Sequence, residues 1–159
     1  MHPEHVQYVQ QLVSALSLPL QSLEEPKEKY YPEEQRSKGT IEQDELIPHI
    51  DKFLQDKQYK PKGFSEKRYS RLLDLSKRFV RYEGRLYRRG RDSQHRLYVR
   101  KENRMYMMTA AHDHNGHRGF FATKSLLTQR FWWPEMERDI NWFVKTCHNC
   151  QELGHDMGL

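Results

Sequence analysis

Residues 112–150 decide the fold of the C-terminal part of this chain, and they read HDHNGHRGFFATKSLLTQRFWWPEMERDINWFVKTCHNC. The histidines His112 and His117 open the stretch, and Cys147 and Cys150, the only two cysteines of the 159-residue chain, close it. Two imidazoles and two thiolates complete a tetrahedral zinc shell and leave no coordination position open for a substrate. The pattern therefore predicts one zinc ion that serves as a structural staple and not as a catalyst.

Other uses of the same residues remain open. His114 could replace His112 as the partner of His117, although we prefer His112 at the end of a helix with His117 in the following turn. A redox pair or a disulfide at Cys147 and Cys150 is disfavoured, because no βαβ pattern precedes the pair and no secretory signal follows Met1. Cys147, Cys150 and His155 also match three ligands of an RNA-binding zinc knuckle, whose fourth ligand would fall just past Leu159.

The residues between the ligands predict a small helical bundle. Helical spacing of Met105, Met108 and His112 places His112 on the inner face of a first helix. We expect Thr123 to cap a second helix and Pro134 to open a third. The residues expected to point inward from these two helices are Leu126, Leu127, Phe131, Met136, Ile140, Phe143, Val144 and Cys147. A domain this short needs the metal for its folding free energy.

Positive charge is concentrated just before this bundle. Residues 57–104 hold 17 Lys and Arg against 5 Asp and Glu, whereas residues 1–56 hold 5 against 11. Such a density attracts a polyanion through phosphate neutralisation, although a solvated face without a partner is the alternative. Tyr82, Tyr87 and Tyr98 lie among the arginines, which favours nucleic acid.

The basic segment also has the pattern of an ordered α+β unit. Ser65 is expected to cap a helix, and residues 79–89 and 96–99 predict a hairpin and a third strand. Val80, Leu86, Leu97 and Val99 would cover one face of this three-stranded antiparallel sheet. Residues 44–57 predict a further amphipathic helix, residues 22–43 a linker, and residues 4–17 a short helix for the core or for a partner. We therefore expect units at 1–43, 44–100 and 101–159, with no membrane-spanning run.

The motifs resemble a known family. The string of His112-Asp113, Gly116-His117-Arg118-Gly119, Thr123-Lys124, Arg130 to Pro134, Cys147 and Cys150-Gln151 is similar to the HHCC zinc-binding domain of retroelement integrases, most of all the gypsy class of LTR retrotransposons. The helix and three strands ahead of it resemble the N-terminal extension domain of such integrases. This resemblance implies DNA as a partner, homo-oligomeric assembly with Trp142 as an exposed contact, and no small-molecule substrate.

The same resemblance bears on catalysis and on the DNA contacts. In the family the catalytic core follows the zinc domain, but nine residues follow Cys150, too few for a core of about 100 residues, so we expect no enzyme activity. A sequence-specific DNA-binding regulator is the alternative. Reduced, zinc-held cysteines predict a nuclear or cytoplasmic protein. The candidate phosphate contacts are Arg85, Arg88, Arg89, Arg91, Arg96, Arg100, Lys101, Arg118 and Lys124.

Overall fold

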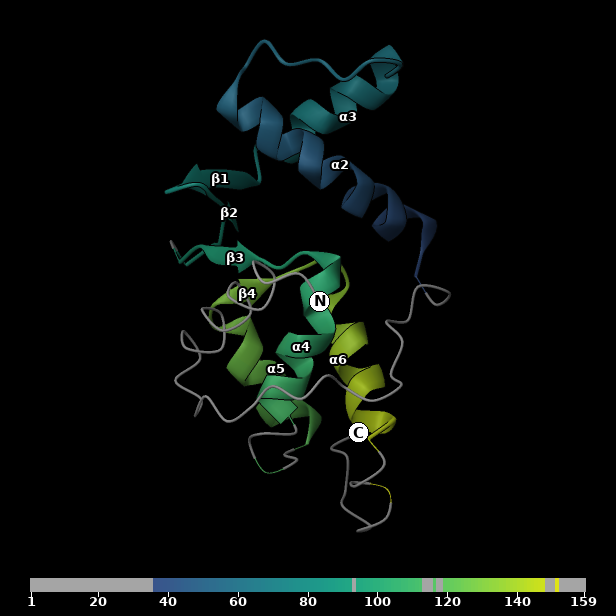
Figure 1. Cartoon of the computed structure of the whole chain (residues 1–159), viewed down its shortest axis with the longest axis vertical. Helices are drawn as coiled ribbons and strands as arrows, with labels where there is room; N and C mark the ends of the chain where they lie inside the picture. Colours follow the sequence, from purple (N-terminus) through teal and green to yellow (C-terminus); the bar gives the residue numbers. More distant parts are fainter. Residues whose placement is uncertain (1–35, 93, 113–115, 117–118, 148–150, 152–159) are drawn as a thin grey trace. The chain divides into compact units, whose positions relative to one another are not determined.

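The computed structural model describes residues 36–92, 94–112, 116, 119–147 and 151. The predicted α+β class is confirmed, because the described residues form five helices and one four-stranded sheet (Figure 1). The chain divides into two compact units, one of residues 35–98 with 130–134 and one that includes residues 99–129 and 135–147. Within the described part of the chain, no helix combines the length and the apolar character that a bilayer crossing requires.

The first unit packs two helices on a sheet. Helix α2 spans Lys38–Gln55 and helix α3 spans Glu66–Ser76. The strands are β1 (Phe79–Tyr82), β2 (Arg85–Arg88), β3 (Arg96–Tyr98) and β4 (Phe131–Trp132), in the spatial order β1-β2-β3-β4. The first three strands run antiparallel, as predicted, and β4 pairs with β3 in parallel. The sheet therefore has one strand more than the sequence indicated.

The helix starts follow from their capping residues. The predicted cap of α3 is confirmed, since the Ser65 hydroxyl accepts a hydrogen bond from the Arg68 amide at 3.1 Å. Helix α2 begins earlier than the predicted residue 44, because Ser37 caps it in the same way through the Thr40 amide at 3.2 Å. Residues 38–43 are therefore helix and not linker. Residues 22–35 of the predicted linker, and the predicted helix at 4–17, lie outside the described residues.

An apolar core holds the first unit together. Its buried members come from both helices and from the first two strands, and they are Leu46, Ile47, Ile50, Leu72, Phe79 and Leu86. The predicted sheet face was wrong in its phase. Leu97 pairs with Tyr87, so it lies on the face opposite to Leu86, which shares the core face with Phe79. Short strands rich in both arginine and apolar residues allow either alternation, and packing on α2 and α3 selects one.

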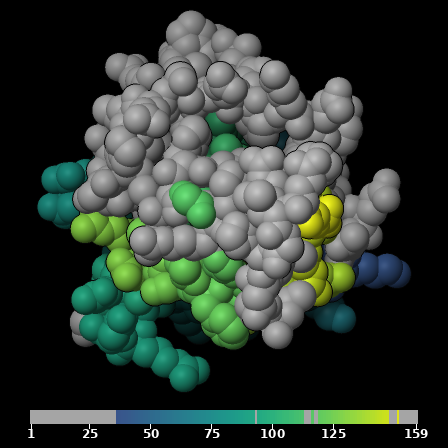
Figure 2. Space-filling model, turned by 90° about the horizontal axis from the view of Figure 1, so that it is seen from below, coloured from purple at the N-terminus to yellow at the C-terminus, as the bar shows by residue number. Residues whose placement is uncertain are grey.

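The second unit is a bundle of three described helices. These are α4 (Lys101–His112), α5 (Phe120–Thr128) and α6 (Met136–Lys145), and each contacts the other two. Helix α4 ends at His112 as predicted. Along α6 the predicted inward face is confirmed by burial of Met136, Ile140, Phe143, Val144 and the following Cys147. Part of the exposed side of α5 is visible as the light-green surface in Figure 2.

Three predictions for this bundle were wrong. Thr123 does not cap α5, because that helix begins at Phe120 after Gly119 and Thr123 is buried inside it. Phe131 belongs to β4 and not to α5, since sheet pairing overrides the helical periodicity of an apolar run. Pro134 does not open α6, because Glu135 adopts a left-handed conformation (φ 56°) that turns the chain before Met136.

Candidate metal centre and nucleic-acid interface

Two of the four predicted zinc ligands lie among the described residues. His112 is the last residue of α4 and has 0% of its surface exposed, and Cys147 follows the end of α6 and is 3% exposed. Helices α4 and α6 contact each other, so both ligands belong to one packed bundle. His117 and Cys150, like the alternatives His114 and His155, lie outside the described residues. A buried imidazole and a buried thiol are donors that zinc prefers, and in this respect the residues fit the metal.

The surroundings of His112 orient its ring. Its Nδ1 atom lies 3.3 Å from the Thr123 hydroxyl oxygen, and the Phe143 ring meets it edge to face with centroids 5.8 Å apart. In the neutral tautomer whose Nδ1–H donates to Thr123, the Nε2 atom is the nitrogen that would bind a metal. Partners of this kind fix the tautomer and the ring direction of metal-binding histidines. Sequence reasoning missed this role of Thr123, because no spacing rule joins residues on two different helices.

The backbone around Cys147 turns tightly. The Cys147 amide donates to the Val144 carbonyl oxygen at 3.2 Å, and the Cys147 carbonyl oxygen accepts from the Gln151 amide at 3.1 Å. The Gln151 side-chain amide also donates to the Lys145 carbonyl oxygen at 2.8 Å. These bonds tie both flanks of the Cys147-x2-Cys150 pair to the end of α6. The main chain next to the thiol is therefore held in place by the helix that precedes it.

The comparison with known families decides what this unit is. Residues 99–156 match the profile of a family described as the integrase zinc binding domain. This part of the chain is an integrase zinc-binding domain. A comparison with curated proteins gave no significant match. The matched range includes the segment 130–134, so the integrase zinc-binding domain contributes strand β4 to the sheet that precedes it in sequence.

The predicted phosphate contacts differ in their exposure and in the groups they contact. Arg88 is half-buried, and its guanidinium lies 4.9 Å from the Trp132 ring centroid and 5.5 Å from that of Phe79. Burial, and to a lesser degree the charge of Arg78, lowers the pKa of Arg88. Arg88 therefore contributes to packing of the first unit, and sequence reasoning missed the aromatic pair that holds it. The signal was weak, because Trp132 follows Arg88 by more than forty positions.

Two other candidates are paired with carboxylates. Arg96 donates two hydrogen bonds to Asp92, at 3.0 and 3.1 Å, which raises the pKa of Arg96 and lowers the pKa of Asp92 to about 2. In the integrase zinc-binding domain, the Lys124 ammonium lies 2.9 Å from a Glu137 carboxylate oxygen. Such pairs neutralise part of the positive field at these positions. Arg118 lies outside the described residues.

Four of the remaining candidates are exposed. Arg85 lies at the start of β2, Arg89 and Arg91 follow its end, and Arg100 precedes α4. Arg89 donates from Nε to the Phe79 carbonyl oxygen at 3.3 Å, while Lys101 is partly buried. Exposed guanidinium groups are the ones that a phosphate can reach without displacing core side chains. The exposed arginines in the hairpin and just after it, Arg85, Arg89 and Arg91, are therefore the best supported candidates.

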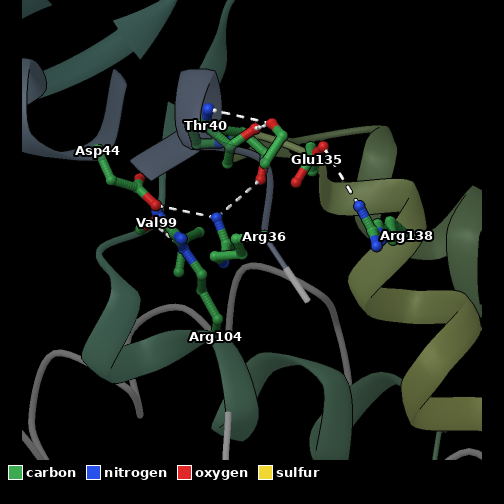
Figure 3. A network of polar contacts seen from close by, with 9 residues as sticks. Arg36, Thr40, Asp44, Val99, Arg104, Glu135 and Arg138 are labelled. Carbon is green, nitrogen blue, oxygen red and sulfur yellow. Dashed lines mark hydrogen bonds and ion pairs between the residues drawn. The ribbon is translucent and has the colours of Figure 1, made fainter. Parts of the chain in front are cut away.

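Not every basic residue contributes to the surface. Arg36 pairs with Asp44 at 2.9 Å, and their side chains are 3% and 15% exposed (Figure 3). In the zinc-binding domain the fully buried Arg104 donates from Nε to the Val99 carbonyl oxygen at 3.1 Å (Figure 3). A buried guanidinium is stable only when its donors have acceptors. Net charge counted along the sequence thus overstates the field at the surface.

Proposed function

We propose that this chain is a non-catalytic N-terminal module of an integrase, from a retroelement or a domesticated descendant, that binds DNA without strong sequence preference. The observation that carries the proposal is the succession of two features along the chain. An integrase zinc-binding domain at residues 99–156 directly follows a folded unit whose residues 57–98 hold 14 basic and 4 acidic side chains. Its partners are element ends or target DNA, and the phosphate backbone supplies most of the affinity.

A single zinc ion is part of this proposal. His112, His117, Cys147 and Cys150 would hold it, and a shell of four protein ligands gives the ion a structural role. The buried His112 and Cys147 support the assignment. When bound, the ion would join the ends of α4 and α6. Thiolates held in this way stay reduced, and we therefore place the protein in the nucleus or cytoplasm.

Assembly into homo-oligomers is the second part of the proposed role. It rests on the resemblance to integrases, in which this domain mediates multimerisation. Trp142, which we expected to be exposed, is only partly exposed and packs against Phe143 with ring centroids 6.4 Å apart. Light scattering of the purified chain across a concentration series tests this part. A constant monomer mass up to high concentration would contradict it.

The DNA-binding role is tested by the salt dependence of affinity. Arg91→Glu changes an exposed residue near the hairpin, and Lys67→Glu makes the same charge change on the exposed side of α3. Fluorescence anisotropy with a duplex at several salt concentrations should show weaker binding and a flatter salt slope for Arg91→Glu, by about one to two counterions. Lys67→Glu should have a smaller effect. Equal effects of the two substitutions would show that the hairpin is not part of the DNA interface. A strong preference for one DNA sequence would favour a sequence-specific DNA-binding regulator.

A further inference from the structure

The register of the hairpin assigns its side chains to two different faces. Tyr82 lies opposite Arg85, and Val80 lies opposite Tyr87. Residues directly opposite each other in an antiparallel pair share a face, and the face alternates along each strand. The other face carries Phe79 and Leu86, which pack into the core with α2 and α3. The face with Val80, Tyr82, Arg85 and Tyr87 is therefore turned away from these helices.

Tyr82 presents a large aromatic surface on this outer face. Its side chain is 64% exposed, although aromatic rings of this size usually gain stability by burial. Tyr82 ends β1 directly before a two-residue turn in which Glu83 (φ 48°) and Gly84 (φ 75°) both have positive φ. Such type I′ turns match the twist of a hairpin and fix its tip. The Tyr82 ring is therefore held beside a tight turn and not on a long loop.

The structure also separates the tyrosines of the basic segment. Tyr98 lies on the core face, where it contacts Trp132 with ring centroids 6.3 Å apart. Tyr87 is half-buried on the outer face, two residues from Arg85. Of the three tyrosines among the arginines, Tyr82 alone is exposed enough to offer a ring face to a ligand. Arg85 directly across from it is exposed as well, and Glu83 is the acidic group of the turn.

We propose that this outer face, with Tyr82, Arg85 and Tyr87, binds unpaired nucleobases, so that the chain prefers single-stranded or frayed DNA over a closed duplex. A base would stack on the Tyr82 ring while Arg85 faces the adjoining phosphate. Stacking on an exposed aromatic side chain beside basic residues is how proteins hold single strands without reading their sequence. The excess of basic over acidic residues in 57–98, 14 against 4, gives the charge complementarity that such a strand needs. This inference rests on the proposed DNA-binding function.

The test compares two DNA forms in the full-length chain. Anisotropy is measured with a labelled 20-nucleotide oligo-dT and with the same strand annealed to oligo-dA. Tyr82→Ala should weaken binding of the single strand about tenfold and of the duplex less than twofold. Tyr82→Trp keeps a stacking ring and should bind the single strand at least as well as wild type. Ile41→Ala, which removes another exposed apolar side chain of the same unit, should change neither affinity.

The outcomes separate this inference from the function on which it rests. Because Tyr82→Ala changes no charge, the salt slope should stay the same while the affinity falls. Unchanged single-strand binding by Tyr82→Ala, or an equal loss for both DNA forms, would overturn the stacking site and leave DNA binding intact. A wild-type chain that binds neither form at low salt would overturn both. As a direct readout, oligo-dT carrying 5-bromodeoxyuridine should photocrosslink to Tyr82, and crosslinks confined to other residues would contradict the site.

Discussion

The two units of this chain bury different kinds of side chain. In the unit of residues 35–98 and 130–134, the core is aliphatic and aromatic, and the buried polar groups among those described are Thr40, Ser76 and the side chain of Arg36, which pairs with Asp44. The zinc-binding unit buries six polar or charged residues within its described part: Asn103, Arg104, Thr109, His112, Thr123 and Asp139. Burying polar groups gives less stability than burying apolar ones. We propose that the apolar core stabilises the first unit, and that the zinc-binding unit depends on the proposed zinc ion in addition to its own apolar core.

The two units also share the chain in an unusual way. Between α5 and α6 the chain leaves the zinc-binding unit, forms β4 in the other unit's sheet, and returns. The Leu97 amide donates to the Arg130 carbonyl oxygen at 2.8 Å at this strand pair. Loss of the metal is therefore a test of how far unfolding spreads along the chain.

Removal of zinc should have the largest effect. Structural zinc contributes about 10 kcal/mol or more to the folding of small zinc domains. Chelation, or Cys147→Ser, should abolish amide protection in α4 and α6, while α2, α3 and the β1–β2 hairpin stay protected. Hydrogen exchange followed by mass spectrometry measures each segment. Retained protection of the Leu97 amide would show that β4 stays paired, and full protection of α4 without zinc would contradict the structural role.

A cavity in the apolar core should destabilise the first unit and leave the zinc-binding unit folded. Ile50 is fully buried, and Ile50→Ala should lower the free energy of unfolding of the first unit by about 2–5 kcal/mol. The zinc content should not change. Ile41→Ala on the exposed side of the same helix is the matched control, with an expected change of about 0.5 kcal/mol or less. If Ile50→Ala released zinc as readily as a ligand substitution, the two units would not differ in what stabilises them.

The Thr123 hydroxyl should matter for the metal more than for packing. Thr123→Val keeps the shape but removes the partner of His112 Nδ1, and we expect zinc affinity to fall about 10- to 100-fold. Thr128→Val is a suitable control, because that hydroxyl donates to the Lys124 carbonyl oxygen within α5. Competition with a chromophoric chelator measures both affinities. Equal affinities for Thr123→Val and wild type would show that the hydrogen bond does not orient the ligand.

The smallest expected effect is a pH dependence of the free energy of unfolding of the first unit. Burial, followed by the charges of Lys52 and Arg68, lowers the pKa of His49 below its usual 6.5, and its Nδ1 lies 2.9 Å from the Tyr59 hydroxyl. The unfolded chain binds a proton on His49 more tightly than the folded chain does. The stability of the first unit therefore has its full value above pH 6.5. It falls as the pH drops from 6.5 toward the pKa in the folded protein. Urea denaturation at pH 7.5 and 5.5 should show this loss, and His49→Gln should reduce it. If His49→Gln lost as much stability between pH 7.5 and 5.5 as wild type, the pH dependence would come from other titratable groups.

The sequence predicted those features that depend on local spacing. The end of α4 at His112, the cap at Ser65 and the apolar face of α6 follow from periodicity and capping, and the structure has them. Strand β4 could not be predicted in this way, because two residues acquire strand conformation only by pairing with a distant neighbour. The phase of the sheet and the partnership of Thr123 with His112 also depend on tertiary packing. The sequence identified the arginines of the basic surface. It could not distinguish Arg88, which packs on aromatic rings, and Arg96, which pairs with Asp92, from the exposed arginines.

Metal content tests the central claim most directly. Inductively coupled plasma mass spectrometry on the purified wild-type chain is compared with His112→Ala, His114→Ala and His155→Ala. The account predicts one zinc per chain in wild type, retained in His114→Ala and His155→Ala and lost in His112→Ala. Loss of zinc in His155→Ala together with retention in His112→Ala would contradict it, since the ligands would then be those of a zinc knuckle.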